Sequence, residues 1–260
     1  MNDVLAYEES GTGPAVVLLH AFPVHAQMWR AQREALACDW RVITPDLPGF
    51  GGSPLAGGDP SLDSVADAVV ATLDSLGLDR VVLGGLSLGG YVSMAVLRRH
   101  PDRVRALILA DTKASADAPA AAENRERIAS TVVSERSVRV LLTDVLPALV
   151  GKKTKRRRGD VLREITDMVR AADPEAVAWI QRAMAARPDS FDTLHAANVP
   201  ALVLVGDEDE LTPPADAEAM VEALPDARLV TIGASGHLSA LEVPDEVTAA
   251  LKDFLRALPD

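Results

Sequence analysis

The segment VVLGGLSLGGYVSMAV, residues 81–96, places Ser87 among four glycines. The apolar residues before Ser87 are typical of a buried strand, and the pattern over Leu88–Arg99 predicts a helix. Ser87 then lies on the turn between them, two residues from Gly85 and from Gly89. Such a turn strains the serine backbone and exposes its hydroxyl, and larger side chains at the two glycines would collide. The segment therefore contains a candidate nucleophile.

Strand-like and helix-like segments alternate along most of the chain. Six apolar runs are typical of strands buried on both faces of a parallel sheet. They are residues 15–20, 41–46, 80–85, 105–111, 201–207 and 227–233. Apolar residues at helical spacing lie between them, as in residues 62–76 and 243–255. The alternation predicts a doubly wound α/β fold, in which helices flank a mostly parallel central sheet.

The alternation stops once, in residues 114–195, where only helical patterns occur. This segment has 14 Lys and Arg against 12 Asp and Glu, whereas the whole chain carries a formal net charge of −12. We therefore predict an all-helical insertion on the α/β core. The predicted core has a first part, residues 1–113, and a second part, residues 196–260.

A serine nucleophile needs a base, and the base needs an acid that orients it. A G-x-S-x-G string alone is as typical of a glycine-rich strand end as of a nucleophile turn. Candidate partners elsewhere in the chain are therefore needed to support the nucleophile. Asp209 lies in VGDEDELTPP and His237 in IGASGHLSALEVP, each directly after a strand-like run. Ligands of parallel sheets bind at the carboxyl ends of strands, and the order Ser, Asp, His suits this architecture. Asp111, which ends an earlier strand, is the alternative acid, and we interpret Asp207 as a turn former.

Composition narrows the class of protein. The chain has 260 residues, of which 48% are apolar and 25% charged, a balance typical of soluble globular proteins. Its start lacks the basic and apolar parts of a signal peptide, and no apolar run approaches the roughly 20 residues that span a bilayer. The one cysteine, Cys38, excludes a disulfide within the chain. We expect a cytoplasmic protein.

The net charge of −12 argues against a nucleic-acid binder, because phosphate contacts need a basic face. One run, KKTKRRR at residues 152–158, has the opposite charge and could hold an anion or a nucleic acid. It contains no aromatic residue to stack on a base, so we interpret it as a solvated helix start or loop. We expect a small-molecule partner, no nucleic acid and no membrane, and a monomer or homodimer.

Five strings together resemble those of the α/β-hydrolase superfamily, and the resemblance covers nearly the whole chain. They are HAFP (20–23), DLPGFGGS (46–53), GLSLGG (85–90), GDEDELTPP (206–214) and GHLSALEVP (236–244). The resemblance implies the α/β-hydrolase fold, with an all-helical cap inserted after the sixth strand. It also implies that Ser87 is the nucleophile, His237 the general base and Asp209 the orienting acid.

The resemblance further implies an oxyanion hole formed by the backbone N–H groups of Phe22 and Leu88. One departure is Ala21, where most relatives have glycine. We expect His20 to pack and form hydrogen bonds beneath this loop. His20 and His25 lack the spacing and the carboxylate neighbours of metal ligands, so we expect no metal and no cofactor.

A serine at position 87 excludes the epoxide hydrolases and haloalkane dehalogenases that use aspartate there. Residues 180–194, IQRAMAARPDSFDTL, loosely resemble the cap end of bacterial 3-oxoadipate enol-lactonase and related carboxylesterases. The resemblance implies a hydrolase that cleaves a small, mainly apolar carboxylic ester or lactone through an acyl-enzyme. The alternatives are an acyltransferase, a cofactor-free perhydrolase or haloperoxidase, and a ligand-binding receptor on the same fold. Trp179 and Met184 are the predicted substrate-pocket residues.

Overall fold

A computed structural model describes residues 4–55 and 57–259. Within them, seven strands form one sheet in the order β1-β3-β2-β4-β5-β6-β7. The strands are β1 (Tyr7–Ser10), β2 (Ala15–Leu19), β3 (Arg41–Pro45), β4 (Val81–Leu86), β5 (Val104–Ala110), β6 (Ala201–Gly206) and β7 (Ala227–Ile232). β1 runs antiparallel to β3, and the other neighbouring strands are parallel. The predicted mostly parallel sheet is confirmed.

The two edge strands are where the structure differs from the sequence prediction. The sequence pattern did not predict β1, because its sequence YEES is short and polar. This strand lies at the sheet edge and pairs with β3 from Tyr7 to Ser10. The opposite edge, β7, was expected to be buried on both faces but is largely half-buried. β4 and β6, between neighbours on both sides, are fully buried.

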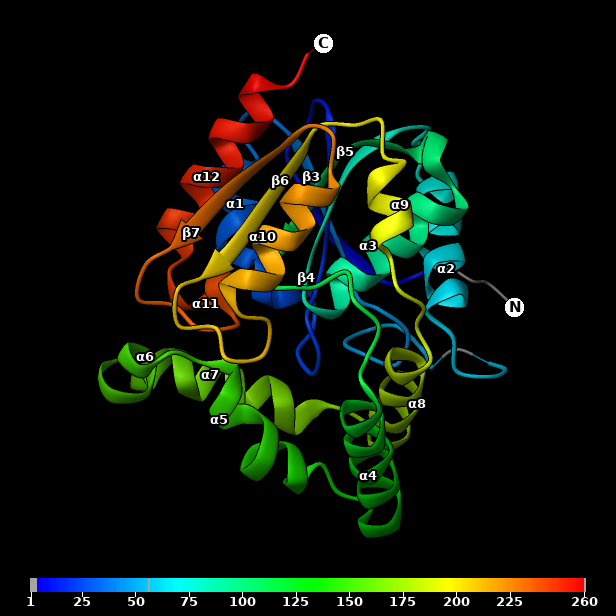
Figure 1. Cartoon of the computed structure of the whole chain (residues 1–260), viewed down its shortest axis with the longest axis vertical. Helices are drawn as coiled ribbons and strands as arrows, with labels where there is room; N and C mark the ends of the chain where they lie inside the picture. The colour runs from blue at the N-terminus through cyan, green and yellow to red at the C-terminus, as the bar shows by residue number, and fades with distance from the viewer. Residues whose placement is uncertain (1–3, 56, 260) are drawn as a thin grey trace.

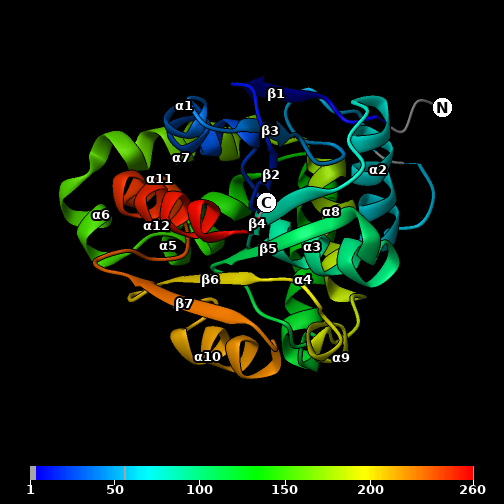
Figure 2. The ribbon, with the colours of Figure 1, turned by 90° about the horizontal axis from the view of Figure 1, so that it is seen from above.

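Helices cover both faces of the sheet, as Figure 2 shows along its strand order. On one face α1 (Arg30–Leu36) packs against α12 (Pro244–Ala257), and on the other α2 (Leu62–Ser75) packs against α3 (Leu88–Arg99). α10 (Pro214–Ala223) covers β6 and β7, and three short helices complete the core: η1 (Ala26–Trp29), η2 (Pro101–Arg103) and α11 (Ser239–Glu242). None of the helices in the described ranges has the length and apolar character that a bilayer span requires.

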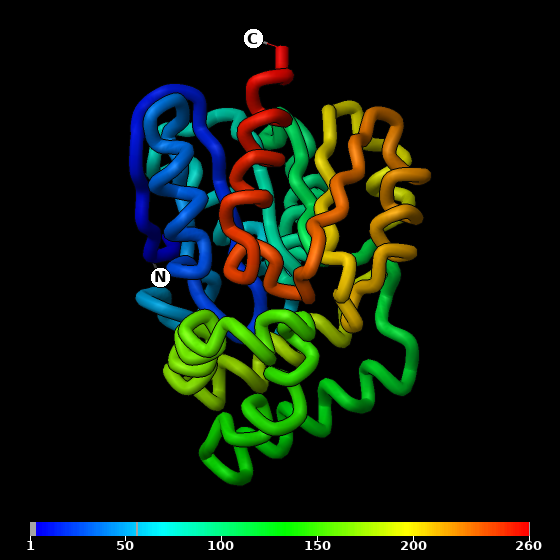
Figure 3. Tube along the Cα trace, turned by 90° about the vertical axis from the view of Figure 1, so that its left-hand side faces the viewer, coloured from blue at the N-terminus to red at the C-terminus, as the bar shows by residue number. Residues whose placement is uncertain are grey.

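The helical insertion leaves the sheet after β5 and lies below the α/β layers in Figures 1 and 3. It comprises α4 (Pro119–Glu135), the π-helical turn η3 (Leu141–Val145), α5 (Leu146–Leu149), α6 (Lys152–Arg157), α7 (Gly159–Ala171), α8 (Pro174–Ala185) and α9 (Phe191–His195). α4 packs along α8, whereas α9 returns to the core beside α3 and α10. Among the described residues five strands precede the insertion, so the expected position after a sixth strand was wrong. Only one strand, the antiparallel β1, precedes β2 among the described residues, so the last strand before the insertion is the fifth, β5.

The basic run lies mostly within α6, at the far end of the insertion in Figure 1. Its charged side chains from Lys152 to Arg157 are exposed, and only Thr154 is buried. A solvated helix start or loop was expected, and the run forms the first of these, an exposed helix.

Candidate active site

Ser87 lies on a tight turn between β4 and α3. Its backbone has φ 54° and ψ −110°, a left-handed conformation that costs a non-glycine residue about 1–3 kcal/mol. A Cβ atom on Gly85 would lie 2.1 Å from the carbonyl carbon of Gly89, and one on Gly89 would lie 2.2 Å from the Leu19 oxygen. Both distances are far inside van der Waals contact. The predicted steric reason for the two glycines is therefore confirmed.

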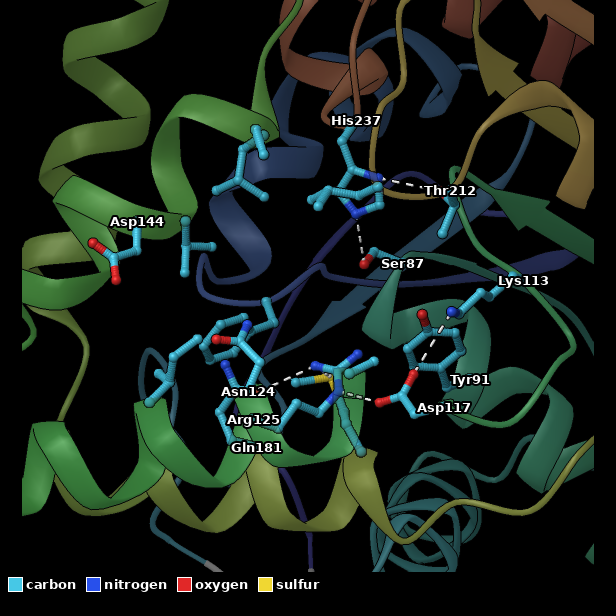
Figure 4. Close-up of a pocket in the computed structure, with 18 residues that line it drawn as sticks. Ser87, Tyr91, Lys113, Asp117, Asn124, Arg125, Asp144, Gln181, Thr212 and His237 are labelled. Carbon is cyan, nitrogen blue, oxygen red and sulfur yellow. Dashed lines mark hydrogen bonds and ion pairs between the residues drawn. The ribbon is translucent and has the colours of Figure 1, made fainter. Parts of the chain in front are cut away.

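The structure brings Ser87, His237 and Asp209 into one hydrogen-bonded series. The Ser87 Oγ lies 2.8 Å from His237 Nε2, and His237 Nδ1 lies 2.8 Å from Asp209 Oδ2. The three residues follow β4, β7 and β6, and all three are buried. Figure 4 shows Ser87 and His237 side by side at the wall of a cavity. With Nδ1–H donating to the carboxylate, Nε2 can accept the serine proton.

The carboxylate of Asp209 is fixed by hydrogen bonds from the residues that follow it in the same turn. Its carboxylate accepts the N–H groups of Leu211 (2.8 Å) and Thr212 (3.1 Å) and the Thr212 hydroxyl (2.8 Å). Burial alone would raise the pKa of Asp209, but the charge and hydrogen bond of His237 and the two hydrogen bonds from Thr212 together lower it. The group beside the histidine is therefore an ionised carboxylate in a fixed orientation.

Asp111, the alternative acid, is fully buried but forms no hydrogen bond with the histidine ring among those of the described residues. One oxygen accepts the Gly206 N–H (2.8 Å), and the other accepts the N–H and hydroxyl of Ser239. It thus ties together the strand end before Asp209 and the helix that follows His237. Burial, followed by the nearby charge of Asp209, raises the pKa of Asp111 to about 7.

The pH profile is expected to report on His237. Burial alone would lower its pKa, but the charge and hydrogen bond of Asp209, with smaller contributions from Asp111 and Glu242, raise it. A base must be neutral to accept a proton, so activity is lost as pH falls through this raised pKa. We expect the acid limb of kcat/KM for an ester to have its midpoint above the ordinary histidine value of about 6.5. A midpoint below that value would contradict the charge balance around the ring.

The two predicted oxyanion donors come from neighbouring strand ends. Phe22 lies in the loop after β2, and Leu88 is the first residue of α3, where a helix leaves its N–H groups unpaired. β2 and β4 are adjacent, with Leu19 opposite Gly85. Neither N–H group donates to a backbone carbonyl of the described residues, so both remain available to a ligand oxygen.

His20 lies beneath this loop, as expected from the sequence. Its Nδ1 donates to the Ala21 oxygen (2.9 Å), and its Nε2 accepts the Leu47 N–H (2.8 Å). Burial lowers the pKa of His20 to about 4, so the ring is neutral and fixed in one tautomer. Ala21, the residue that departs from the usual glycine, is fully buried.

A cavity of about 250 Å³ opens beside Ser87 and His237. It is lined by residues from both the core and the insertion: Phe22, Ser87, Tyr91, Lys113, Asp117, Ala121, Asn124, Arg125, Ile128, Asp144, Val145, Ala148, Leu149, Gln181, Met184, Leu211, Thr212 and His237. The predicted residue Met184 is among them. Within the described ranges, no group of three or more His, Cys, Asp or Glu is arranged to hold a metal ion.

Trp179, the other predicted pocket residue, does not line this cavity. Its indole N–H instead donates to the Gly58 oxygen at 3.2 Å. At about 100° per residue, Trp179 lies on another face of α8 from Gln181 and Met184, which share one face. The prediction for Trp179 was therefore wrong, because both residues were chosen for apolar character rather than for one helix face.

Lys113, Asp117 and Arg125 were missed as pocket residues. The sequence carried one usable signal, since Lys113 follows the carboxyl end of β5, where parallel sheets bind ligands. Asp117 and Arg125 reach the cavity because the chain turns back into α4. That path depends on how the insertion packs, which the sequence pattern does not show.

Glu242 joins the insertion to the histidine loop. Its buried carboxylate accepts the N–H groups of Gly151 (2.8 Å), which precedes α6, and Gly236 (2.9 Å), which precedes His237. A further bond runs from the Leu238 N–H to the Leu149 oxygen at 3.1 Å. The backbone of the loop that carries His237 is therefore hydrogen-bonded to the insertion.

Replacing Glu242 by glutamine is expected to lower the free energy of unfolding by about 1–3 kcal/mol. The amide nitrogen cannot accept a hydrogen bond, so one of the buried N–H groups, of Gly151 or Gly236, loses its acceptor. Urea denaturation monitored by circular dichroism measures the change. Glu246→Gln, at an exposed position in α12, is the matched control. Equal stability of the two variants would argue against this bridge.

Comparisons with known proteins support one family. The model of the family described as alpha/beta hydrolase fold matches residues 14–244. The chain is 30% identical over 254 residues to the pimeloyl-(acyl-carrier protein) methyl ester esterase of Aromatoleum aromaticum, covering 94% of this chain and 98% of that protein. A malate-bound thermophilic esterase from Thermogutta terrifontis superposes with TM-score 0.94 at 43% identity, over 98% of this chain and 93% of that one. The enol-lactonase of Burkholderia xenovorans LB400 gives TM-score 0.89 at 29% identity, over 97% and 96%.

Proposed function

Because the chain belongs to the α/β-hydrolase fold family, we propose that it cleaves a small carboxylic ester or lactone through a covalent acyl-enzyme. The observation that carries this proposal is the series from Ser87 through His237 to Asp209, with both distances at 2.8 Å. The esterases and the enol-lactonase among its relatives support carboxylic ester hydrolysis as the reaction class.

In the proposed acylation step, the Ser87 oxygen attacks the carbonyl carbon of the substrate while His237 Nε2 takes the hydroxyl proton. The carbonyl oxygen becomes an oxyanion, for which the N–H groups of Phe22 and Leu88 are the proposed donors. As the intermediate collapses, the imidazolium returns its proton to the departing alcohol oxygen. Asp209 stabilises the imidazolium throughout.

Deacylation follows the same path with water in place of the serine hydroxyl. His237 removes a proton from the water, whose oxygen attacks the acyl carbon, and the proton then passes to the Ser87 oxygen. The product acid leaves, and the enzyme is restored. Another acceptor at this step would give an ester or peracid, so the acceptor separates hydrolysis from the acyltransferase and perhydrolase alternatives.

The cavity supports a substrate of modest size. Its volume of about 250 Å³ is just below the usual range for ligand pockets of about 300–1,000 Å³. Ile128, Val145 and Leu149 supply an apolar side from the insertion. We therefore propose that the body of the ester or lactone is mainly apolar.

The proposal is tested by labelling the protein with an alkyl fluorophosphonate and locating the adduct by mass spectrometry. We expect one adduct, on Ser87, and hydrolysis of short acyl esters or lactones that the label abolishes. Added methanol or hydrogen peroxide measures how much of the acyl group goes to acceptors other than water. A protein that neither reacts with the label nor cleaves any ester would favour the receptor alternative.

A further inference from the structure

A charged cluster forms one side of the cavity beside Ser87. Lys113, Asp117 and Arg125 line it, and Arg187 lies behind them. In Figure 4 Lys113, Asp117 and Arg125 lie below Ser87, and His237 lies above it. None of these side chains has a part in the proposed ester chemistry.

The cations outnumber the carboxylates in this cluster. Asp117, whose side chain is 1% exposed, forms ion pairs with Lys113 (3.7 Å), Arg187 (2.9 Å) and Arg125. Burial alone would raise the pKa of Asp117, but the hydrogen bond and charge of Arg125, followed by Arg187, lower it, so it is ionised. Asp216 adds a second negative charge near Lys113 without an ion pair within 4.0 Å. Asp144, which also lines the cavity, is already paired with Arg127 at 3.0 Å. In the cluster, three cations against two carboxylates therefore leave one positive charge.

The excess charge is best assigned to Lys113, because the two arginines are already engaged. Arg187 donates to the Met184 and Ser115 oxygens and lies over the Tyr91 ring at 4.0 Å. Arg125 donates to Asp117 and to the Gln181 side-chain oxygen at 3.1 Å.

Lys113, by contrast, lies 3.7 Å from the Asp117 oxygen, which is beyond hydrogen-bond distance. Its side chain is 21% exposed, and it lines the cavity. An ammonium group held there without a close acceptor can accommodate an anionic oxygen. A charge-assisted hydrogen bond to such an oxygen is about twice as strong as a neutral one.

We propose that Lys113, supported by Arg125, binds a carboxylate of the substrate. The preferred substrates are then small esters or lactones that carry one free carboxylate, such as half-esters of short dicarboxylic acids. A single negative charge balances the one excess positive charge, and the small cavity suits a carboxylate better than a larger polyanion. This inference rests on the proposed function, because it names the substrate class of the same site.

The test compares esters that differ only by a methyl group or a carboxylate. Ethyl butyrate is the neutral reference, ethyl hydrogen succinate carries the carboxylate on the acyl side, and butyryl glycolate carries it on the alcohol side. We expect wild type to have a kcat/KM at least tenfold higher for one of the charged esters than for ethyl butyrate. Lys113→Gln should lower that preference, the ratio of the two kcat/KM values, by roughly ten- to a hundredfold.

Lys153→Gln is the matched control, because it removes the same charge from an exposed position in α6. It should keep the wild-type preference. Binding of the two charged esters to Ser87→Ala, measured by titration calorimetry, gives a readout that needs no turnover. Adding Lys113→Gln to that variant should weaken binding of the preferred charged ester by the same factor, and ethyl butyrate, which has no carboxylate, should bind weakly to both.

The possible outcomes separate the two proposals. If Ser87 is labelled and ethyl butyrate is cleaved, but neither charged ester is preferred or Lys113→Gln leaves the preference unchanged, the carboxylate site is wrong and the hydrolase stands. If no ester is cleaved and Ser87 is not labelled, the proposed function is wrong. In that case Lys113-dependent binding of a charged ester alone decides whether the carboxylate site exists.

Discussion

Ser87→Ala is expected to lower kcat for ester hydrolysis by roughly 10⁴-fold or more, with the fold retained. The change removes the only oxygen that lies 2.8 Å from His237 Nε2 in the described part of the chain, and so removes the acyl-enzyme route. Alanine is no larger than serine and fits between Gly85 and Gly89 in the same turn. Steady-state kinetics on a short acyl ester measure the loss, and circular dichroism checks the fold.

Ser93→Ala is the matched control for this experiment. Ser93 is buried in α3, the helix that follows Ser87, and its hydroxyl donates to the Gly89 oxygen at 2.8 Å rather than to the histidine. The same chemical change there should leave turnover within a few-fold of wild type and should preserve fluorophosphonate labelling. Near-normal turnover by Ser87→Ala would remove Ser87 from the role of nucleophile.

The central strands were predictable because each is a continuous apolar run in the sequence. A strand between two neighbours and two helical layers must be apolar on both faces, so runs such as residues 201–207 stand out. The short polar strand β1 has no such requirement, because it borders solvent and gains its place through backbone pairing with β3. Its pairing partner lies more than 30 residues away, and nothing in YEES indicates it.

The candidate site also has a part that the sequence predicts and a part that it does not. Ser87, Asp209 and His237 each follow a strand end, so the parallel sheet brings them together once the strands are known. The cavity wall has no comparable rule, since it depends on which face each insertion helix turns inward. Met184 faces the cavity and Trp179 does not, although both are apolar, buried and on one helix. Asp117 and Arg125 line the cavity because of how the insertion packs, which the sequence pattern does not show.

The two buried aspartates near His237 are expected to respond very differently to the same substitution. Asp209→Asn should lower kcat by roughly 10³- to 10⁴-fold, because an amide in that place favours the wrong histidine tautomer and cannot stabilise the imidazolium. The loss should be clear at every pH, since the Nδ1 contact at 2.8 Å is changed directly. Asp209→Asn and Asp111→Asn are each compared with wild type for kcat, pH profile and thermal stability.

Asp111→Asn should cost no more than about tenfold in kcat above the acid limb. Its amide oxygen can still accept the Gly206 N–H, and asparagine tolerates the positive φ of 43° at this position. Its negative charge contributes to the raised pKa of His237, so removing it should move the acid midpoint of kcat/KM to lower pH. The Ser239 N–H loses its acceptor, so some loss of stability is expected as well, but a purely structural defect would leave that midpoint in place. If Asp111→Asn proves the more damaging change while both variants are folded, the orienting acid is Asp111, and Asp209 is a residue of the loop.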